Sequence, residues 1–284
     1  MRGFPGPRSG VTGQSQINTT MLGLIVSLIT LSAPAHAPHW TLTFEDNFDG
    51  PGGSAPSKAK WARDVGGSGY GNNELESYTD GNSNAFLDGK GNLVIQARKE
   101  PTTGPDGRKR DYSSARLLTK GKFSQKYGRV EARIKIPKGQ GIWPAFWMLG
   151  DDIGTAGWPG CGEIDILESV GPQAKTAYGT LHGPGYSGAN GVQGKLESET
   201  SFADDFHVYA LEWEPGEIRW YVDTTCFSTV KRDRVGAKGW PFDQPFFIIL
   251  NLAVGGYWPG YPDATTSFPQ QMIVDYVRVY KHSS

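Results

Sequence analysis

Residues 162–169 read GEIDILES and place three carboxylates within six residues of a stretch that is otherwise as apolar as a buried strand. Strict alternation would send Glu163 and Asp165 to one face and Glu168 to the other, beside the two isoleucines. A β-bulge near residues 166–167 removes this conflict, because two residues then oppose one. We therefore expect the three acids to share one face. The plainer alternative is a solvated edge strand.

The composition favours an all-β fold. The chain has 284 residues with 39 glycines, 19 prolines and 12% aromatic residues, which is typical of many short strands joined by tight turns. Alternation is clearest at 130–136 and 273–280, and the only helix expected is a short one near Asp204 and Asp205. Because so many strands would overfill a flat sheet, we predict a two-sheet sandwich with one sheet curved into a cleft.

The N-terminal segment is predicted to be a secretory signal. Two arginines precede the apolar run 21–31, which begins with a methionine that is an alternative start, and Ala35-His36-Ala37 follows. Cleavage is expected after Ala37, so that 1–37 is the signal and 38–284 is one catalytic domain. The run is too short to span a bilayer. We expect a secreted, extracellular protein.

The net charge restricts the classes of binding partner, and the cysteine count restricts the possible disulfides. Residues 1–37 contain two arginines and no acids, which leaves 26 basic and 29 acidic residues in 38–284. This balance predicts no nucleic-acid partner and no membrane partner, and it points to a neutral substrate and a monomer. Cys161 and Cys226 permit one disulfide, but two unbonded thiols are an equal alternative.

The acids and nearby aromatic residues indicate carbohydrate chemistry. Two carboxylates that flank a scissile bond are the minimum equipment for glycoside hydrolysis, and Glu163 and Glu168 are expected to lean toward each other over Asp165, at the spacing of a retaining pair. An inverting spacing is the less comfortable alternative. Trp143 and Trp258 offer platforms for the apolar faces of sugar rings, with core packing as the alternative.

Several blocks of the sequence resemble glycoside hydrolase family 16, in particular its bacterial laminarinase-like endo-β-1,3-glucanases. They are the acidic motif 163–168, the segment 141–149 (GIWPAFWML), and the blocks 44–48, 71–79, 127–133, 251–256 and 275–280. The resemblance implies an all-β, concanavalin A-like jelly roll of two curved antiparallel sheets with the cleft on the concave face. The extra residue, Leu167, separates this branch from lichenases and xyloglucan-active enzymes.

The resemblance also implies roles. Glu163 is expected to be the nucleophile, Glu168 the general acid/base and Asp165 an auxiliary residue, with no cofactor for catalysis. The expected substrate-binding residues are Asn73, Arg116, Trp143, Trp147, His182, Asn251 and Trp258. The alternatives are a surface salt bridge for Arg116, core packing for Trp147 and a structural role for His182. Glu76 stands where relatives often have glutamine, which we expect to alter a subsite contact.

A structural calcium ion is a further expectation from the resemblance, with Glu45, Gly91 and Asp275 as its ligands. The predicted function is a secreted retaining endo-glycosidase that hydrolyses β-1,3-glucan of the laminarin type, with mixed β-1,3-1,4-glucan as a possible second substrate. Two alternatives stay open. One is a non-catalytic β-glucan-binding protein on the same fold, and the other is a galactan hydrolase that acts on agar or carrageenan.

Overall fold

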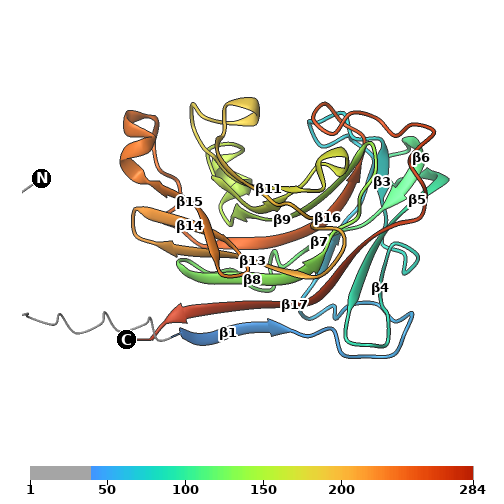
Figure 1. Cartoon of the computed structure of the whole chain (residues 1–284), viewed down its shortest axis with the longest axis horizontal. Helices are drawn as coiled ribbons and strands as arrows, with labels where there is room; N and C mark the ends of the chain where they lie inside the picture. Colours follow the sequence, from blue (N-terminus) through green and yellow to red (C-terminus); the bar gives the residue numbers. More distant parts are fainter. Residues whose placement is uncertain (1–39, 284) are drawn as a thin grey trace, which may run out of the picture. The chain divides into compact units, whose positions relative to one another are not determined.

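Two stacked β-sheets form the part of the chain that the structure, a computed structural model, describes, residues 40–283 (Figure 1). The larger sheet contains β15 (Thr225–Lys231), β14 (Glu217–Val222), β13 (His207–Glu214), β8 (Gly128–Lys135), β17 (Gln270–His282), β5 (Leu93–Thr103), β6 (Lys109–Ser114) and β3 (Glu76–Tyr78) in that order, with β1 (Trp40–Asp46) on β17 and β4 (Ala85–Leu87) on β5. The predicted signal at 1–37 lies outside the described residues.

The second sheet carries the acidic motif. Its order is β12 (Val192–Glu197), β11 (Thr176–His182), β10 (Glu163–Glu168), β9 (Ile142–Gly150), β16 (Phe246–Val254), β7 (Arg116–Leu118) and β2 (Ala62–Asp64). Every pairing is antiparallel except the parallel pair β3–β6. In Figure 1 this sheet curves above the larger one, and β10 lies near its middle. The predicted two-sheet sandwich is confirmed.

Helices are few and short. The elements are α1 (Ile153–Ala156) and the 3-10 turns η1 (Gly171–Gln173), η2 (Gly188–Asn190), η3 (Arg232–Arg234) and η4 (Gly236–Lys238). The helix expected near Asp204 was wrong, because those residues form a turn. Over residues 40–283 no helix is long and apolar enough to cross a membrane. Cys161 is buried and Cys226 is exposed, and neither is in a disulfide.

A buried contact from the opposite sheet holds the acidic strand β10 in place. Trp220 of β14 is fully buried, and its indole N–H donates to the main-chain oxygen of Asp165 at 2.7 Å. Gly179 of β11 leaves room for this ring, since a Cβ atom there would lie 2.4 Å from the indole. A backbone oxygen near the bulge is therefore satisfied from the opposite sheet, and β10 is held at a defined depth.

Candidate active site

The predicted bulge in the acidic strand is present. Along β9, Asp165 pairs with Trp147 and Leu167 pairs with Phe146, so the unpaired residue is Ile166 and not the expected Leu167. Ile166 and Leu167 are both buried in the core. The side chains of Glu163, Asp165 and Glu168 all line one cavity as a result. The edge-strand alternative is excluded, because β10 lies between β9 and β11.

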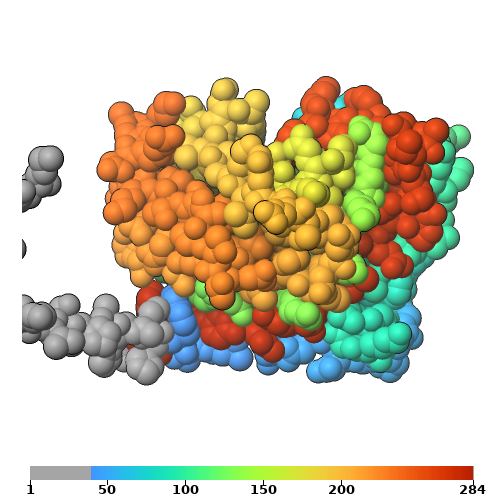
Figure 2. Space-filling view, in the orientation of Figure 1, coloured from blue at the N-terminus to red at the C-terminus, as the bar shows by residue number. Residues whose placement is uncertain are grey.

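That cavity has a volume of about 940 Å³ and opens on the face of the seven-stranded sheet that points away from the core. The hollow is visible at the top of Figure 2, between the yellow segments and the red and green ones. The lining residues with polar or aromatic side chains are Tyr70, Asn72, Glu74, Arg116, Trp143, Trp147, Trp158, Glu163, Asp165, Glu168, Thr180, His182, Gln193, Asn251, Tyr257 and Trp258.

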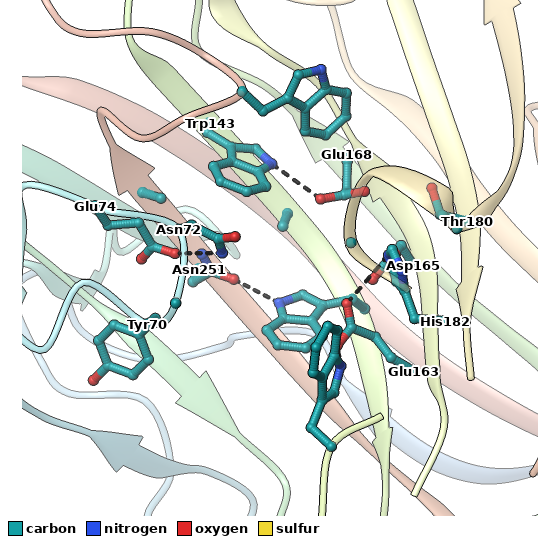
Figure 3. A pocket seen from close by; sticks show the side chains of 18 of the residues that line it. Tyr70, Asn72, Glu74, Trp143, Glu163, Asp165, Glu168, Thr180, His182 and Asn251 are labelled. Carbon is teal, nitrogen blue, oxygen red and sulfur yellow. Dashed lines mark hydrogen bonds and ion pairs between the residues drawn. The ribbon is translucent and has the colours of Figure 1, made fainter. Parts of the chain in front are cut away.

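Glu163 and Asp165 meet His182 of the neighbouring strand (Figure 3). The Nε2 atom of His182 lies 3.1 Å from Asp165 Oδ2 and 3.7 Å from Glu163 Oε1. The other oxygen of Glu163, Oε2, accepts a 2.8 Å hydrogen bond from the indole N–H of Trp158, which is half exposed. Glu163 thus accepts one hydrogen bond, from Trp158, and faces His182 at ion-pair distance, and both contacts favour its ionised form.

Glu168 occupies a different environment at the other end of the row. Its Oε1 accepts a 3.2 Å hydrogen bond from the indole N–H of Trp143. Trp143 in turn contacts Trp258 edge to face, with ring centroids 5.5 Å apart, and Trp258 contacts Tyr178 at 5.0 Å. No salt bridge reaches Glu168 from the residues that the structure places. The aromatic side chains shield this acid from solvent.

Burial raises the pKa of all three acids, and the charge of Asp165 adds to the shift in Glu163 and Glu168. The pKa of Glu163 is raised to about 8, first by burial and then by the charge of Asp165, while His182 and Trp158 oppose the shift. Burial also raises the pKa of Asp165 to about 8. The pKa of Glu168 is raised well above its ordinary value by burial and by the charge of Asp165. These three carboxyl groups therefore retain protons near neutral pH, as a general acid catalyst requires.

The opposite half of the cavity has an aromatic and cationic wall. The guanidinium of Arg116 lies 4.7 Å from the ring centroid of Tyr70 and 4.8 Å from that of Trp147, and its Nε is 3.2 Å from Asp64 Oδ2. Arg116 is therefore both a cavity residue and half of a salt bridge. The Trp147 indole donates to Asn251 Oδ1 at 2.7 Å, and Trp147 lines the cavity while it also packs against the small apolar cluster that contains Phe247.

One expected binding residue does not line the cavity. Asn73 has a positive φ of 59° and donates instead to the Tyr261 hydroxyl at 2.6 Å, whereas its neighbours Asn72 and Glu74 line the cavity. The left-handed backbone at Asn73 changes which positions of this segment face inward, and substrate binding by Asn73 stays a prediction. Trp158 was missed, although its place in the Gly- and Pro-rich segment before Glu163 was a usable signal.

The expected calcium ligands have other partners. Glu45 Oε1 lies 2.9 Å from Arg278 Nε, and Asp275 Oδ2 lies 2.7 Å from Arg133 Nη1. Both carboxylates would have to leave an arginine to bind a cation, so the arrangement does not favour calcium. Gly91 lies in a turn with a φ of 86°. The calcium site stays a prediction.

Comparison with known proteins agrees with this geometry. The family model for glycosyl hydrolases family 16 matches residues 72–278. A β-glucanase from Rhodothermus marinus is 46% identical over 255 residues, which cover 86% of each chain.

Solved structures show the same arrangement of strands. The endo-β-1,3-glucanase from Pyrococcus furiosus superposes with a TM-score of 0.83 at 49% identity over 87% of this chain and 96% of that chain. The laminarinase from Rhodothermus marinus gives a TM-score of 0.79 at 45% identity over 87% and 99%. The expected laminarinase-like jelly roll is confirmed. By sequence, fold and the acids in its cleft, the chain belongs to glycosyl hydrolase family 16 and is a glycoside hydrolase.

Proposed function

We propose that the protein hydrolyses internal bonds of β-1,3-glucan by a retaining mechanism. One observation carries this proposal: the bulge in β10 places Glu163, Asp165 and Glu168 side by side along one open cavity. Relatives described as an endo-β-1,3-glucanase and a laminarinase support the substrate. An open cavity also suits attack within a chain, because both ends of a polymer can extend from it.

Glu163 is the proposed nucleophile. It attacks the anomeric carbon and forms a glycosyl-enzyme ester, while Glu168 gives its proton to the departing glycosidic oxygen. Water then attacks the same carbon, gives its proton to Glu168 and releases Glu163, so both groups return to their starting state. Asp165 and His182 hold the Glu163 carboxylate, and Trp158 fixes its second oxygen.

The cavity wall fits a neutral sugar chain. Among its described lining residues, the ionisable groups are four acids, His182 and Arg116, and Arg116 is already paired with Asp64. The described lining offers a sulfate group no lysine, and its one arginine is already paired with Asp64, which disfavours the carrageenan alternative. Exposed or half-buried rings of Trp143, Trp158 and Trp258 supply platforms for uncharged sugars.

The proposal is tested by product analysis on laminarin, lichenan, agarose and xyloglucan. We expect rapid loss of viscosity and short oligosaccharides from laminarin, slower release from lichenan, and none from agarose or xyloglucan. Glu163→Gln is expected to retain laminarin binding and lose turnover. Release from agarose exceeding that from laminarin, or substantial turnover by Glu163→Gln, contradicts the assignment.

Three further properties are proposed from the sequence. We propose secretion with cleavage after Ala37, which N-terminal sequencing of protein from the culture medium tests. We also propose a monomer, which light scattering tests. Calcium at Glu45, Gly91 and Asp275 is the third, and a melting temperature that is unchanged by chelator would argue against it.

A further inference from the structure

A chain of hydrogen-bonded side chains connects two parts of the cavity wall, and Figure 3 labels three of its members, Asn251, Asn72 and Glu74. The indole N–H of Trp147 donates to Asn251 Oδ1 at 2.7 Å, and the Asn251 amide donates to the Tyr78 hydroxyl at 3.1 Å. The Tyr78 hydroxyl donates to Glu74 Oε2 at 3.1 Å, and Asn72 donates to Glu74 Oε1 at 3.1 Å. All donors in the chain therefore converge on one carboxylate, Glu74.

The direction of this chain is fixed by chemistry. An indole N–H can only donate, so the oxygen of Asn251 must face Trp147 and its NH2 group must face Tyr78. The Tyr78 hydroxyl then accepts from Asn251 and has a single proton left, which goes to Glu74. Glu74 is the terminal acceptor of the chain, a role that its ionised form fulfils with both oxygens.

Glu76 follows this acceptor by two residues and is completely buried, and the charge of Glu74 acts on it. Its Oε2 accepts a 2.7 Å hydrogen bond from the main-chain N–H of Val254, while its Oε1 is buried without any donor. Ionised, Glu76 would leave an unsatisfied anionic oxygen next to the Glu74 carboxylate. Burial, the charge of Glu74 and a hydrogen bond to Glu74 raise the pKa of Glu76 well above its ordinary range. Protonated, the same Oε1 becomes a donor to Glu74.

The same segment also holds the loop on the far side of the cavity. Glu76 binds the N–H of Val254 at the end of β16, and the N–H of Tyr257 donates to the main-chain oxygen of Asn72 at 2.9 Å. The loop beyond β16 carries Trp258 into the cavity wall. Glu76 therefore acts on Glu74, where the chain from Trp147 ends. It also binds Val254, which precedes the loop that carries Trp258.

We propose that Glu76 is a positioning residue that works as a neutral carboxylic acid, donating its proton to Glu74 and so anchoring the chain through Tyr78 and Asn251 to Trp147. The proposal rests on the proposed function, since it is there that this part of the cavity wall is assigned to sugar binding. It also revises the expectation that Glu76 alters a subsite contact directly. Glu76 does not line the cavity and acts through Glu74.

Infrared difference spectroscopy tests the protonation without any substrate. At neutral pH we expect Glu76→Gln to lose part of the carbonyl band of protonated carboxyl groups, whereas the catalytic acids contribute equally in both proteins. The matched control is Glu197→Gln, because Glu197 is exposed and paired with Lys195, with its pKa lowered by that partner. An unchanged protonated-carboxyl band in Glu76→Gln overturns the proposal, whatever the protein hydrolyses.

Kinetics test the positioning role. Glu76→Gln keeps one donor and one acceptor, so we expect kcat and KM on laminarin within about twofold of wild type. Tyr78→Phe and Glu76→Met each remove a donor to Glu74, and each is expected to raise KM about 3–10-fold with kcat within twofold, as for one lost hydrogen bond. If Glu76→Met does not fold, the kinetics of Tyr78→Phe and the infrared spectra of Glu76→Gln still test the proposal. Unchanged KM in folded Tyr78→Phe contradicts the chain of contacts.

Discussion

The hydrogen bond from Trp158 to Glu163 has a measurable consequence for catalysis. The bond is 2.8 Å long and its donor ring is half exposed. A hydrogen bond to a charged group contributes about 1.5–3 kcal/mol when buried, and the half-exposed donor limits this bond to the lower end of that range or just below it, about 1–1.5 kcal/mol. Since 1.36 kcal/mol corresponds to one pKa unit, Trp158→Phe should raise the pKa of Glu163 by about one unit.

The sign of the pH effect follows from the role of Glu163. The nucleophile must be ionised, and the indole N–H stabilises the ionised form. Its removal therefore moves the acidic limb of kcat/KM to higher pH and lowers kcat/KM about 5–12-fold on that limb. The assay is kcat/KM on laminarin across pH. Trp40→Phe is the matched control, because this ring lies against His282 and outside the cavity.

The pH at which the acidic limb of kcat/KM lies distinguishes a hydrogen bond from Trp158 to Glu163 from simple stacking of Trp158 on a sugar ring. If Trp158 acts only as a platform, Trp158→Phe changes KM at every pH and leaves the limb in place. A limb within about 0.3 pH units of wild type, where the lost bond predicts about one, refutes the reasoning.

Other perturbations give independent tests. Asp165→Asn removes the negative charge that raises the pKa of Glu163, so the acidic limb of kcat/KM should move to lower pH, opposite to Trp158→Phe. Trp258→Ala should raise KM about 3–10-fold on laminarin at constant kcat through loss of one ring contact. Glu163→Gln should melt about 10 °C higher than wild type at pH 8 and equally at pH 4 in calorimetry. The unfolded chain ionises Glu163 near 4.5 and the folded chain near 8, so wild-type stability falls as pH rises between these values.

The central part of the site was predictable because the sequence contains a local conflict. Glu168 falls on the core face under strict alternation, and only a bulge satisfies both it and Leu167. The structure resolves the conflict with Ile166 as the extra residue. Such a conflict involves neighbours within six residues, so no knowledge of long-range contacts was needed.

The outer parts of the site were less predictable because they depend on contacts between distant segments. Asn73 was expected in the cavity, yet a left-handed backbone turns it to Tyr261, a residue 188 positions away. Trp158 lies only five residues before Glu163, but the segment between them contains no regular alternation that would predict their hydrogen bond. A pattern of residues shows which types lie near the acids but not which atoms meet.

Raised pKa values alone do not identify catalytic acids in this protein. Burial raises the pKa of Glu76 as it does that of Glu168, and a second carboxylate adds to the shift in both cases. The difference lies in access: Glu168 lines the cavity and can pass its proton to a departing sugar oxygen, whereas Glu76 faces only Glu74 and Val254. The same physical cause therefore produces a proton donor where the site is open and a structural hydrogen bond where it is sealed.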